Sequence, residues 1–171
     1  MQKAATFGVG VEYALHCLLF LIDIPAGANL GIKDIAAFQG ISVTYLSKVF
    51  ARLKKAGLVR STPGVKGGYE LACRPGEITF LDVVEAVEGP LSLFQCREIR
   101  QNCILNEGSS VTPYVPQGTC AIHAVMMQAE AQVRKHLEAK TLGWLHASLQ
   151  ASLPAKRLEA TRNWFKAALA E

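Results

Sequence analysis

Apolar side chains recur every three or four positions near the start of the chain, a spacing that places them on one face of a helix. A first helix is therefore predicted from Phe7 to about Ile22, and the proline and glycine of 25–27 end it. A short second helix is expected from about Ile32, with Asp34 in its first turn, where a negative charge suits the helix dipole. Gly40 closes this second helix.

The next apolar run predicts a third helix, with Ser42 as its N-cap and Gly57 as its stop. Its buried stripe is expected to consist of Tyr45, Leu46, Val49, Phe50 and Leu53. Its exposed face then carries Val43, Thr44, Ser47, Lys48 and Arg52. Two helices joined by a turn at Gly40 and Ile41 are typical of a helix-turn-helix, whose second helix fits the major groove of DNA.

Two short strands, 58–61 and 69–72, are predicted after the third helix, with a glycine-containing loop at 63–68 between them. This hairpin would form the wing of a winged helix-turn-helix. Glycines in its loop permit close approach to a sugar-phosphate backbone. Thr79 begins a further helix, to Glu88, with a start that resembles a capping box.

The second half of the chain is expected to contain a long helix that Thr119 caps and that reaches about Leu142, followed by an amphipathic segment after Pro154. The apolar stripe of the long helix is Ile122, Val125, Met126, Ala129, Val133 and Leu137. No segment of matching length is present to cover it. Packing against a second copy is the simplest way to bury such a stripe, so we expect a homodimer.

Positive charge is concentrated between Ile35 and Tyr69, which hold six basic residues and no acidic one. The remainder has 12 Lys and Arg against 14 Asp and Glu, so the formal net charge of +4 is +6 from this segment and −2 from elsewhere. Such concentration indicates a nucleic-acid partner, here double-stranded DNA. The predicted DNA-binding residues are Ser42, Val43, Thr44, Ser47, Lys48, Arg52, Lys66 and Gly67.

Half of the 171 residues are hydrophobic and 19% are charged, which is enough to bury a core. Charged or polar residues interrupt the first apolar run, which argues against a signal peptide or a membrane span. Five cysteines, an odd number, suit a reducing cytoplasm better than a closed disulfide framework. The sequence has no phosphate-binding glycine loop and no nucleophile elbow. We therefore expect a cytoplasmic protein that is not an enzyme, with no membrane partner and no small-molecule substrate.

Short motifs spread from Phe7 to about Trp144 are shared with a known family. They are Ile35-Ala36, Ile41-Ser42, Tyr45-Leu46, Ala56-Gly57-Leu58-Val59-Arg60-Ser61, Gly67-Gly68-Tyr69, Ile78-Thr79 and Val87-Glu88. In this combination the chain resembles the Rrf-two family of bacterial winged-helix transcriptional regulators. The resemblance implies a dimer whose long helices cross and, in many members, an iron–sulfur cluster near that crossing.

Residues 11–17 and 96–101 resemble the RsrR-like branch of that family, in which both subunits supply ligands to one cluster. The resemblance implies a 2Fe–2S cluster held by Cys96 and Cys120 of one subunit with Glu12 and His16 of the other. Glu12 and His16 are four residues apart and so share one helix face. An ordinary carboxylate–imidazole pair on the surface is the alternative reading of that spacing.

Other readings of the cysteines remain open. Cys103 has no counterpart in the RsrR-like ligand set, and His123 is an alternative ligand. A cluster-free regulator could instead switch by thiol–disulfide chemistry among Cys96, Cys103 and Cys120. An electron carrier that holds a cluster is a third hypothesis, which the acid-free basic segment disfavours.

The expected fold is mainly α with a small β wing, a winged helix-turn-helix plus a long dimerisation helix. We expect a DNA-binding domain at 1–90, a cluster-binding loop at 91–118, the dimerisation helix at 119–145 and a C-terminal helical extension at 146–171. The expected function is that of a homodimeric transcriptional regulator that senses redox state, nitric oxide or iron–sulfur status through the shared 2Fe–2S cluster.

Overall fold

The computed structural model describes residues 7–25, 27–64, 67–102, 104–106 and 117–170. The chain divides into two compact units, one formed by the residues up to Pro90 with those from His136 onward, and the other by Leu91–Lys135. We call the first the core unit and the second the cysteine unit. In the described residues, no helix is both long enough and apolar enough to cross a membrane.

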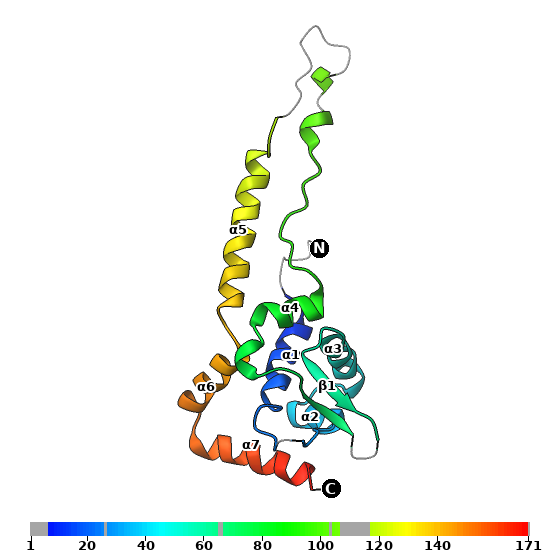
Figure 1. Ribbon diagram of the computed structural model, residues 1–171, viewed down its shortest axis with the longest axis vertical. Coiled ribbons are helices and arrows are strands. Elements are labelled where there is room, and N and C mark those ends of the chain that lie inside the picture. Colours follow the sequence, from blue (N-terminus) through cyan, green and yellow to red (C-terminus); the bar gives the residue numbers. More distant parts are fainter. Residues whose placement is uncertain (1–6, 26, 65–66, 103, 107–116, 171) are drawn as a thin grey trace. The chain divides into compact units, whose positions relative to one another are not determined.

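The core unit begins with the predicted helix-turn-helix (Figure 1). The first three helices of the unit are α1 (Val9–Leu19), α2 (Ile32–Gln39) and α3 (Val43–Lys55), and α2 and α3 form the helix-turn-helix. Gly40 ends α2 with φ 69°, and Gly57 follows α3 with φ 77°, both in the left-handed region that glycine tolerates best. Both stops are as the sequence predicts.

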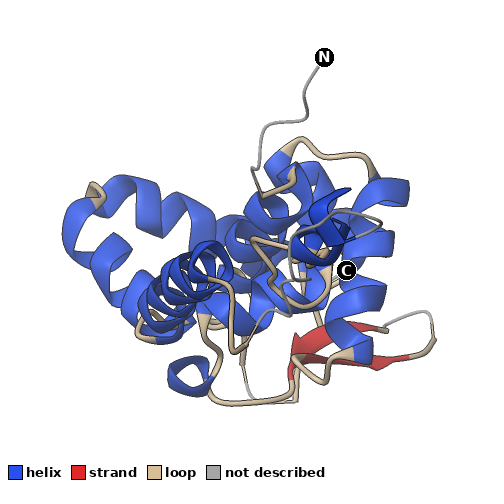
Figure 2. Ribbon diagram, turned by 90° about the horizontal axis from the view of Figure 1, so that it is seen from above, coloured by secondary structure: helices blue, strands red, loops and turns tan. Residues whose placement is uncertain are grey.

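A two-stranded antiparallel sheet follows α3, drawn in red in Figure 2. Strand β1 (Val59–Thr62) pairs with β2 (Gly68–Leu71), with Val59 opposite Leu71 and Thr62 opposite Gly68. Leu30 extends this sheet by one bridge, since its backbone exchanges two hydrogen bonds of 3.0 and 2.9 Å with Tyr69. The wing is therefore attached to the segment that precedes α2.

The remaining elements of the core unit are the 3-10 turn η1 (Pro75–Glu77), α4 (Phe80–Glu88), α6 (Leu142–Ser152) and α7 (Ala155–Ala168). Thr79 and Asp82 form the expected capping box of α4, with hydrogen bonds of 2.8 and 3.0 Å. Helix α1 packs against α3, α4 and α6, and α3 against α2 and α4. The fully buried side chains between them include Leu18, Leu30, Ile35, Leu46, Phe50, Leu53, Val83 and Leu142.

The cysteine unit contains two 3-10 turns, η2 (Ile99–Asn102) and η3 (Ile104–Asn106), and most of α5 (Ala121–Glu138). Within this unit the backbone N–H of Leu93 donates to the Glu130 carboxylate at 2.9 Å, which attaches the segment before Cys96 to α5. The expected extended loop at 106–118 lies largely outside the described residues.

Helix α5 is shorter than the sequence predicts, because the chain turns after Glu138 and begins α6 at Leu142. The Thr141 side chain caps α6 by accepting a hydrogen bond from the Trp144 N–H at 3.1 Å. Backbone bonds from Leu142 to Ile78 (2.9 Å) and from Phe80 to Lys140 (2.8 Å) fix this turn. The apolar periodicity of the sequence continues from α5 into α6, so it could not show that α5 ends at Glu138 and that Thr141 caps a new helix.

Three local expectations also need correction. Phe7 lies before α1 and is 48% exposed. Ser42 occupies the N-cap position of α3, but its side chain makes no capping hydrogen bond. Tyr45 is 40% exposed instead of buried, and its ring contacts Tyr13 of α1 in an edge-on arrangement with ring centroids 5.7 Å apart.

Candidate functional site

The start of α3 presents the residues that the sequence assigned to reading DNA bases. Val43, Thr44 and Lys48 are exposed, and Ser47 is half-buried. Leu46 and Val49 hold the opposite face of the helix in the core, at 0% and 3% exposure. The first turns of α3 are therefore free to enter a groove while the helix stays anchored.

The wing is tied to α3 by its own side chains. The Lys54 ammonium donates to the Ser61 hydroxyl at 2.6 Å, and Arg60 pairs with Glu70 across the two strands at 3.2 Å. A side chain at Gly67 would place its Cβ 2.3 Å from the Thr62 carbonyl oxygen, so this position requires glycine. The predicted DNA contact Lys66 lies outside the described residues.

Arg52 has a structural partner that sequence reasoning missed. Its guanidinium donates to the Val87 carbonyl at the end of α4, at 2.6 Å. This bond joins α3, the predicted recognition helix, to α4. The expected contact of Arg52 with the DNA backbone stays a prediction. In the structure, Arg52 links α3 to α4.

Glu12 and His16 share the exposed face of α1, as their spacing predicts. Both line a pocket of about 340 Å³ whose other walls, including Leu15, Phe80 and Leu145, are apolar. Among the described residues, neither has a hydrogen-bond or ion-pair partner, and the two do not pair with each other. Both side chains are exposed at the edge of this hollow, so they are accessible to an outside partner.

Cys96 and Cys120 line one pocket of about 300 Å³ within the cysteine unit. Both thiols are half-buried and free. The Cys120 carbonyl accepts the first hydrogen bond of α5, from Ala124 at 2.8 Å, so Cys120 and not Thr119 stands at the N-cap position. The helix N-terminus favours negative charge on a group placed there.

A backbone N–H group near Cys96 is directed at its sulfur atom. The Glu98 N–H donates to Cys96 Sγ at 3.4 Å, the kind of bond that tunes the thiolates of iron–sulfur sites. Glu98 has φ 47°, the one positive φ outside glycine among the described residues. A hydrogen bond and ion pair from Arg100 hold the pKa of the Glu98 carboxyl below its usual range.

His123 belongs to the same pocket, one turn of α5 beyond Cys120. Its Nδ1 atom is buried and has no hydrogen-bond partner among the described residues. The Phe94 ring lies 6.0 Å from its ring, centroid to centroid. Sequence reasoning held His123 only as an alternative ligand, and the three-residue spacing from Cys120 was the signal for its place here.

Cys96, Cys120 and His123 suit an iron–sulfur cluster in type, since thiolate and imidazole are ligands that such clusters use. In the described chain, no three His, Cys, Asp or Glu side chains are gathered closely enough to hold a metal ion. Cys103, the other predicted thiol, lies outside the described residues. Any cluster at Cys96 and Cys120 would need ligands beyond those that one described chain brings together.

Cys17 differs from the cysteines of this pocket, because burial raises the pKa of its thiol to about 12. We expect iodoacetamide to leave Cys17 unmodified in the folded protein at pH 8 to 9, where exposed Cys73 reacts, since the thiolate is the nucleophile. Peptide mass spectrometry measures both sites, with guanidinium-unfolded protein as the control. Equal labelling of the two in folded protein would contradict the burial of Cys17.

A helix-turn-helix with an anchored wing and an exposed basic helix defines a winged-helix DNA-binding protein. Residues 8–148 match the model of the Rrf2 family, described as iron-dependent transcriptional regulators. The chain therefore belongs to the Rrf2 family of DNA-binding transcriptional regulators, as the sequence motifs indicated.

Individual relatives agree with this assignment. The transcriptional regulator NsrR of Geobacillus kaustophilus is 37% identical over 150 residues, which cover 85% of this chain and 95% of the relative. IscR of Aliivibrio salmonicida is 30% identical over 133 residues, which cover 76% of this chain and 72% of the relative. The structure of CymR, the global cysteine regulator of Bacillus subtilis, is similar with a TM-score of 0.62 and 26% identity over 86% of this chain and 98% of that one.

Proposed function

We propose that this protein is a homodimeric cytoplasmic transcriptional regulator whose affinity for operator DNA is set by a 2Fe–2S cluster shared between subunits. Cys96 and Cys120 of one chain would supply two ligands, with Glu12 and His16 of the partner subunit supplying the others. The observation that carries the proposal is the shared pocket of Cys96 and Cys120, with an N–H directed at the Cys96 sulfur. When bound, the cluster supplies a one-electron redox change.

Dimerisation would depend on α5, none of whose residues is fully buried. Ile122 and Val125, in the predicted apolar stripe, are 67% and 61% exposed. In a dimer that packs through this stripe, the Ile122 and Val125 side chains of both chains are removed from water. The hydrophobic effect then stabilises the dimer. The proposal further requires that α1 of the second chain reach the site that Cys96 and Cys120 line.

Helix α1 provides the connection between such a site and DNA. It carries Glu12 and His16 on one face, while Tyr13 packs against Tyr45 of α3 with ring centroids 5.7 Å apart. At Gly10 an added Cβ would lie only 3.1 Å from the Tyr45 hydroxyl, so α1 and α3 are in close contact. Releasing or holding Glu12 and His16 would therefore act on the recognition helix through α1.

His123 is the competing ligand, favoured by its buried, unpartnered Nδ1. We expect His16→Ala to remove most of the visible absorption of anaerobically purified protein, whereas His123→Ala retains it. Iron and acid-labile sulfide assays on the same samples report cluster content independently. If His123→Ala loses the cluster and His16→Ala keeps it, His123 is the ligand in place of His16 and the proposed ligand set is wrong.

A thiol switch is the second candidate function, because Cys96 and Cys120 line one pocket as free thiols. Oxidation by hydrogen peroxide would join the two sulfurs, with both thiol protons and both electrons passing to peroxide to give two waters. Protein purified anaerobically without iron or sulfide, yet with peroxide-sensitive DNA binding, would favour this function over the cluster.

Sequence-specific binding should depend on the exposed start of α3. We expect Thr44→Ala to lose about 1 to 3 kcal/mol on the selected operator and little on random DNA, because a base contact is removed. Lys66→Ala should weaken binding to all sequences and lower the salt dependence by about one counterion. Fluorescence anisotropy over a salt series measures both. Equal losses by Thr44→Ala on operator and random DNA would contradict direct base readout.

A further inference from the structure

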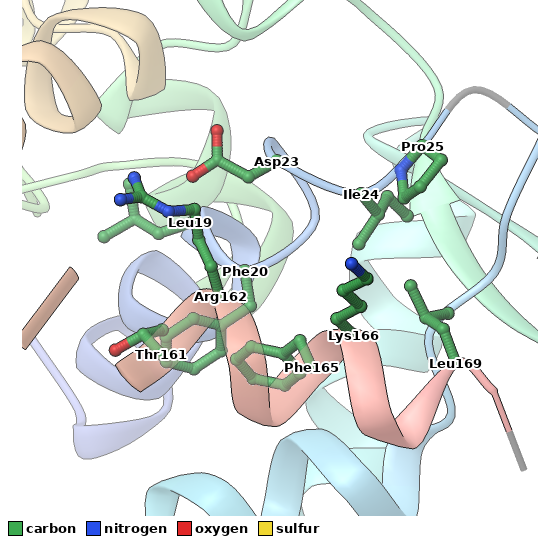
Figure 3. A pocket seen from close by; sticks show the side chains of 10 residues that line it. All are labelled: Leu19, Phe20, Asp23, Ile24, Pro25, Thr161, Arg162, Phe165, Lys166 and Leu169. Carbon is green, nitrogen blue, oxygen red and sulfur yellow. The ribbon is translucent and has the colours of Figure 1, made fainter. Parts of the chain in front are cut away.

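The core unit contains a pocket of about 300 Å³ between the end of α1 and α7, away from the residues discussed so far. Its apolar wall includes Leu19, Phe20, Ile24, Phe165 and Leu169 (Figure 3). The Phe20 and Phe165 rings lie 4.8 Å apart, centroid to centroid, at 36° to each other. Two aromatic side chains in the lining of one small hollow give it an apolar wall against which an aromatic guest can pack.

The polar groups of this pocket are mainly cationic. Arg162 and Lys166 lie on successive turns of α7, and both side chains line the pocket (Figure 3). Among the described residues, neither has an ion-pair partner. The one carboxylate of the lining, Asp23, accepts a hydrogen bond from His146 Nε2 at 3.0 Å. Two cations beside an apolar wall, with no ion-pair partner in the described part of the chain, are complementary to an anion with an apolar body.

We infer that this pocket binds a small aromatic monocarboxylate as an effector. The aromatic body would lie against Phe20 and Phe165, and the carboxylate would pair with Arg162 and Lys166. A neutral aromatic molecule would leave both cations unpaired, and a simple anion would leave the apolar wall exposed to water. The charge and the apolar wall together therefore select the class of ligand.

The pocket is connected to the helix-turn-helix by an aromatic cluster. Phe38 of α2 lies 5.0 Å from Phe20 and 4.7 Å from Phe165, and 5.1 Å from Trp164, between ring centroids. Helix α2 packs directly on α3. A guest that shifts Phe20 or Phe165 therefore acts on the first helix of the DNA-binding motif.

Most of the pocket's chemistry comes from α7, which lies beyond the segment matched by the family model, residues 8–148. Both cations and Phe165 belong to this helix. Binding at this site does not depend on a cluster, because none of its lining residues belongs to the cysteine unit. Only its effect on DNA affinity depends on the family assignment.

The test uses full-length protein labelled with ¹⁵N and titrated with 2-naphthoate. We expect saturable shifts confined to α7 and the end of α1, with a dissociation constant of about 1 mM or tighter. The neutral 2-naphthamide should bind about tenfold more weakly, because the charge-assisted bonds to Arg162 and Lys166 are lost. Equal binding of acid and amide, or no saturable shift at these residues, would overturn the inference.

Variants separate the site from general effects of charge. Arg162→Gln and Lys166→Gln should each weaken 2-naphthoate binding about tenfold. Arg157→Gln, on the same helix but outside the lining, is the matched control and should bind as the parent does. If Arg157→Gln loses as much, binding is non-specific. If Arg162→Gln changes the oligomeric state in sedimentation, the hollow is an interface between chains and the inference is wrong.

Fluorescence anisotropy with a duplex selected by the protein tests the coupling. Saturating 2-naphthoate should change DNA affinity by about 5- to 150-fold, the usual range of allosteric coupling. The Arg162→Gln protein should show no change at the same concentration. Binding of 2-naphthoate with unaltered DNA affinity would contradict the effector role, while DNA binding without the ligand tests the family function separately.

Discussion

Val125→Asp is expected to dissociate the dimer. Under the proposed function the 61% exposed Val125 side chain is buried by the second chain, so each dimer would bury two aspartates in an apolar seam. An unpaired buried ion costs several kcal/mol, and 1.4 kcal/mol corresponds to a tenfold change in an equilibrium constant. Dimerisation should therefore weaken by roughly a thousandfold or more. Sedimentation velocity over a range of protein concentrations measures this change.

Ala131→Asp is the matched control for the α5 interface. Ala131 is exposed on the same helix but lies outside the apolar stripe, so its aspartate should stay in water and leave the dimer intact. Val133→Asp, in the stripe, should behave like Val125→Asp. A dimer that survives both stripe substitutions would place the subunit interface elsewhere.

The second large effect is expected from replacing Cys96 and Cys120 together by alanine. This variant should contain no bound iron or sulfide after anaerobic purification, because both thiolate ligands are missing. Its DNA affinity should no longer respond to oxidant or nitric oxide. The two side chains are half-buried in a pocket of the cysteine unit, so the core unit should keep its free energy of unfolding.

Cys17→Ala provides the contrast to this double variant. The Cys17 side chain on α1 is fully buried in the core. Its replacement by alanine leaves a cavity and lowers the free energy of unfolding. The cluster absorption should be unchanged. Retention of the full absorption by the Cys96→Ala/Cys120→Ala protein would instead exclude both residues as ligands.

Most of the DNA-binding part could be predicted from the sequence, because its signals are local. Gly40 and Gly57 end helices through their own left-handed conformations, and Thr79 caps α4 with a residue three positions away. Apolar periodicity then determines which face of each helix is buried. Such features need no knowledge of distant contacts.

The end of α5 could not be predicted, because it depends on residues far apart in the chain. The bridge between Thr79 and Thr141 and the burial of Leu142 turn the backbone where periodicity continues. The burial of the His123 Nδ1 atom is another such case, although the three-residue spacing of His123 from Cys120 indicated that the residue lies near that thiol. Its buried Nδ1 depends on how Phe94 and the segment around Cys96 pack on α5.

The pocket beside α7 was also beyond sequence reasoning. The sequence predicted an amphipathic segment after Pro154, but periodicity does not say that Phe165 of this segment packs on Phe20 and Phe38. A charge count likewise does not distinguish Arg162 and Lys166 from the other basic residues outside the segment from Ile35 to Tyr69. Only the packing places them over an apolar wall.

The central claim is that one cluster takes ligands from two chains, and mixing two defective variants tests it directly. Glu12→Ala/His16→Ala protein and Cys96→Ala/Cys120→Ala protein should each lack the cluster. A heterodimer of the two rebuilds one complete site, so its visible absorption should return to about half the wild-type amplitude per dimer. Absorption that stays absent although co-purification on two different tags shows heterodimers, or a full cluster in either parent variant alone, would contradict the shared site.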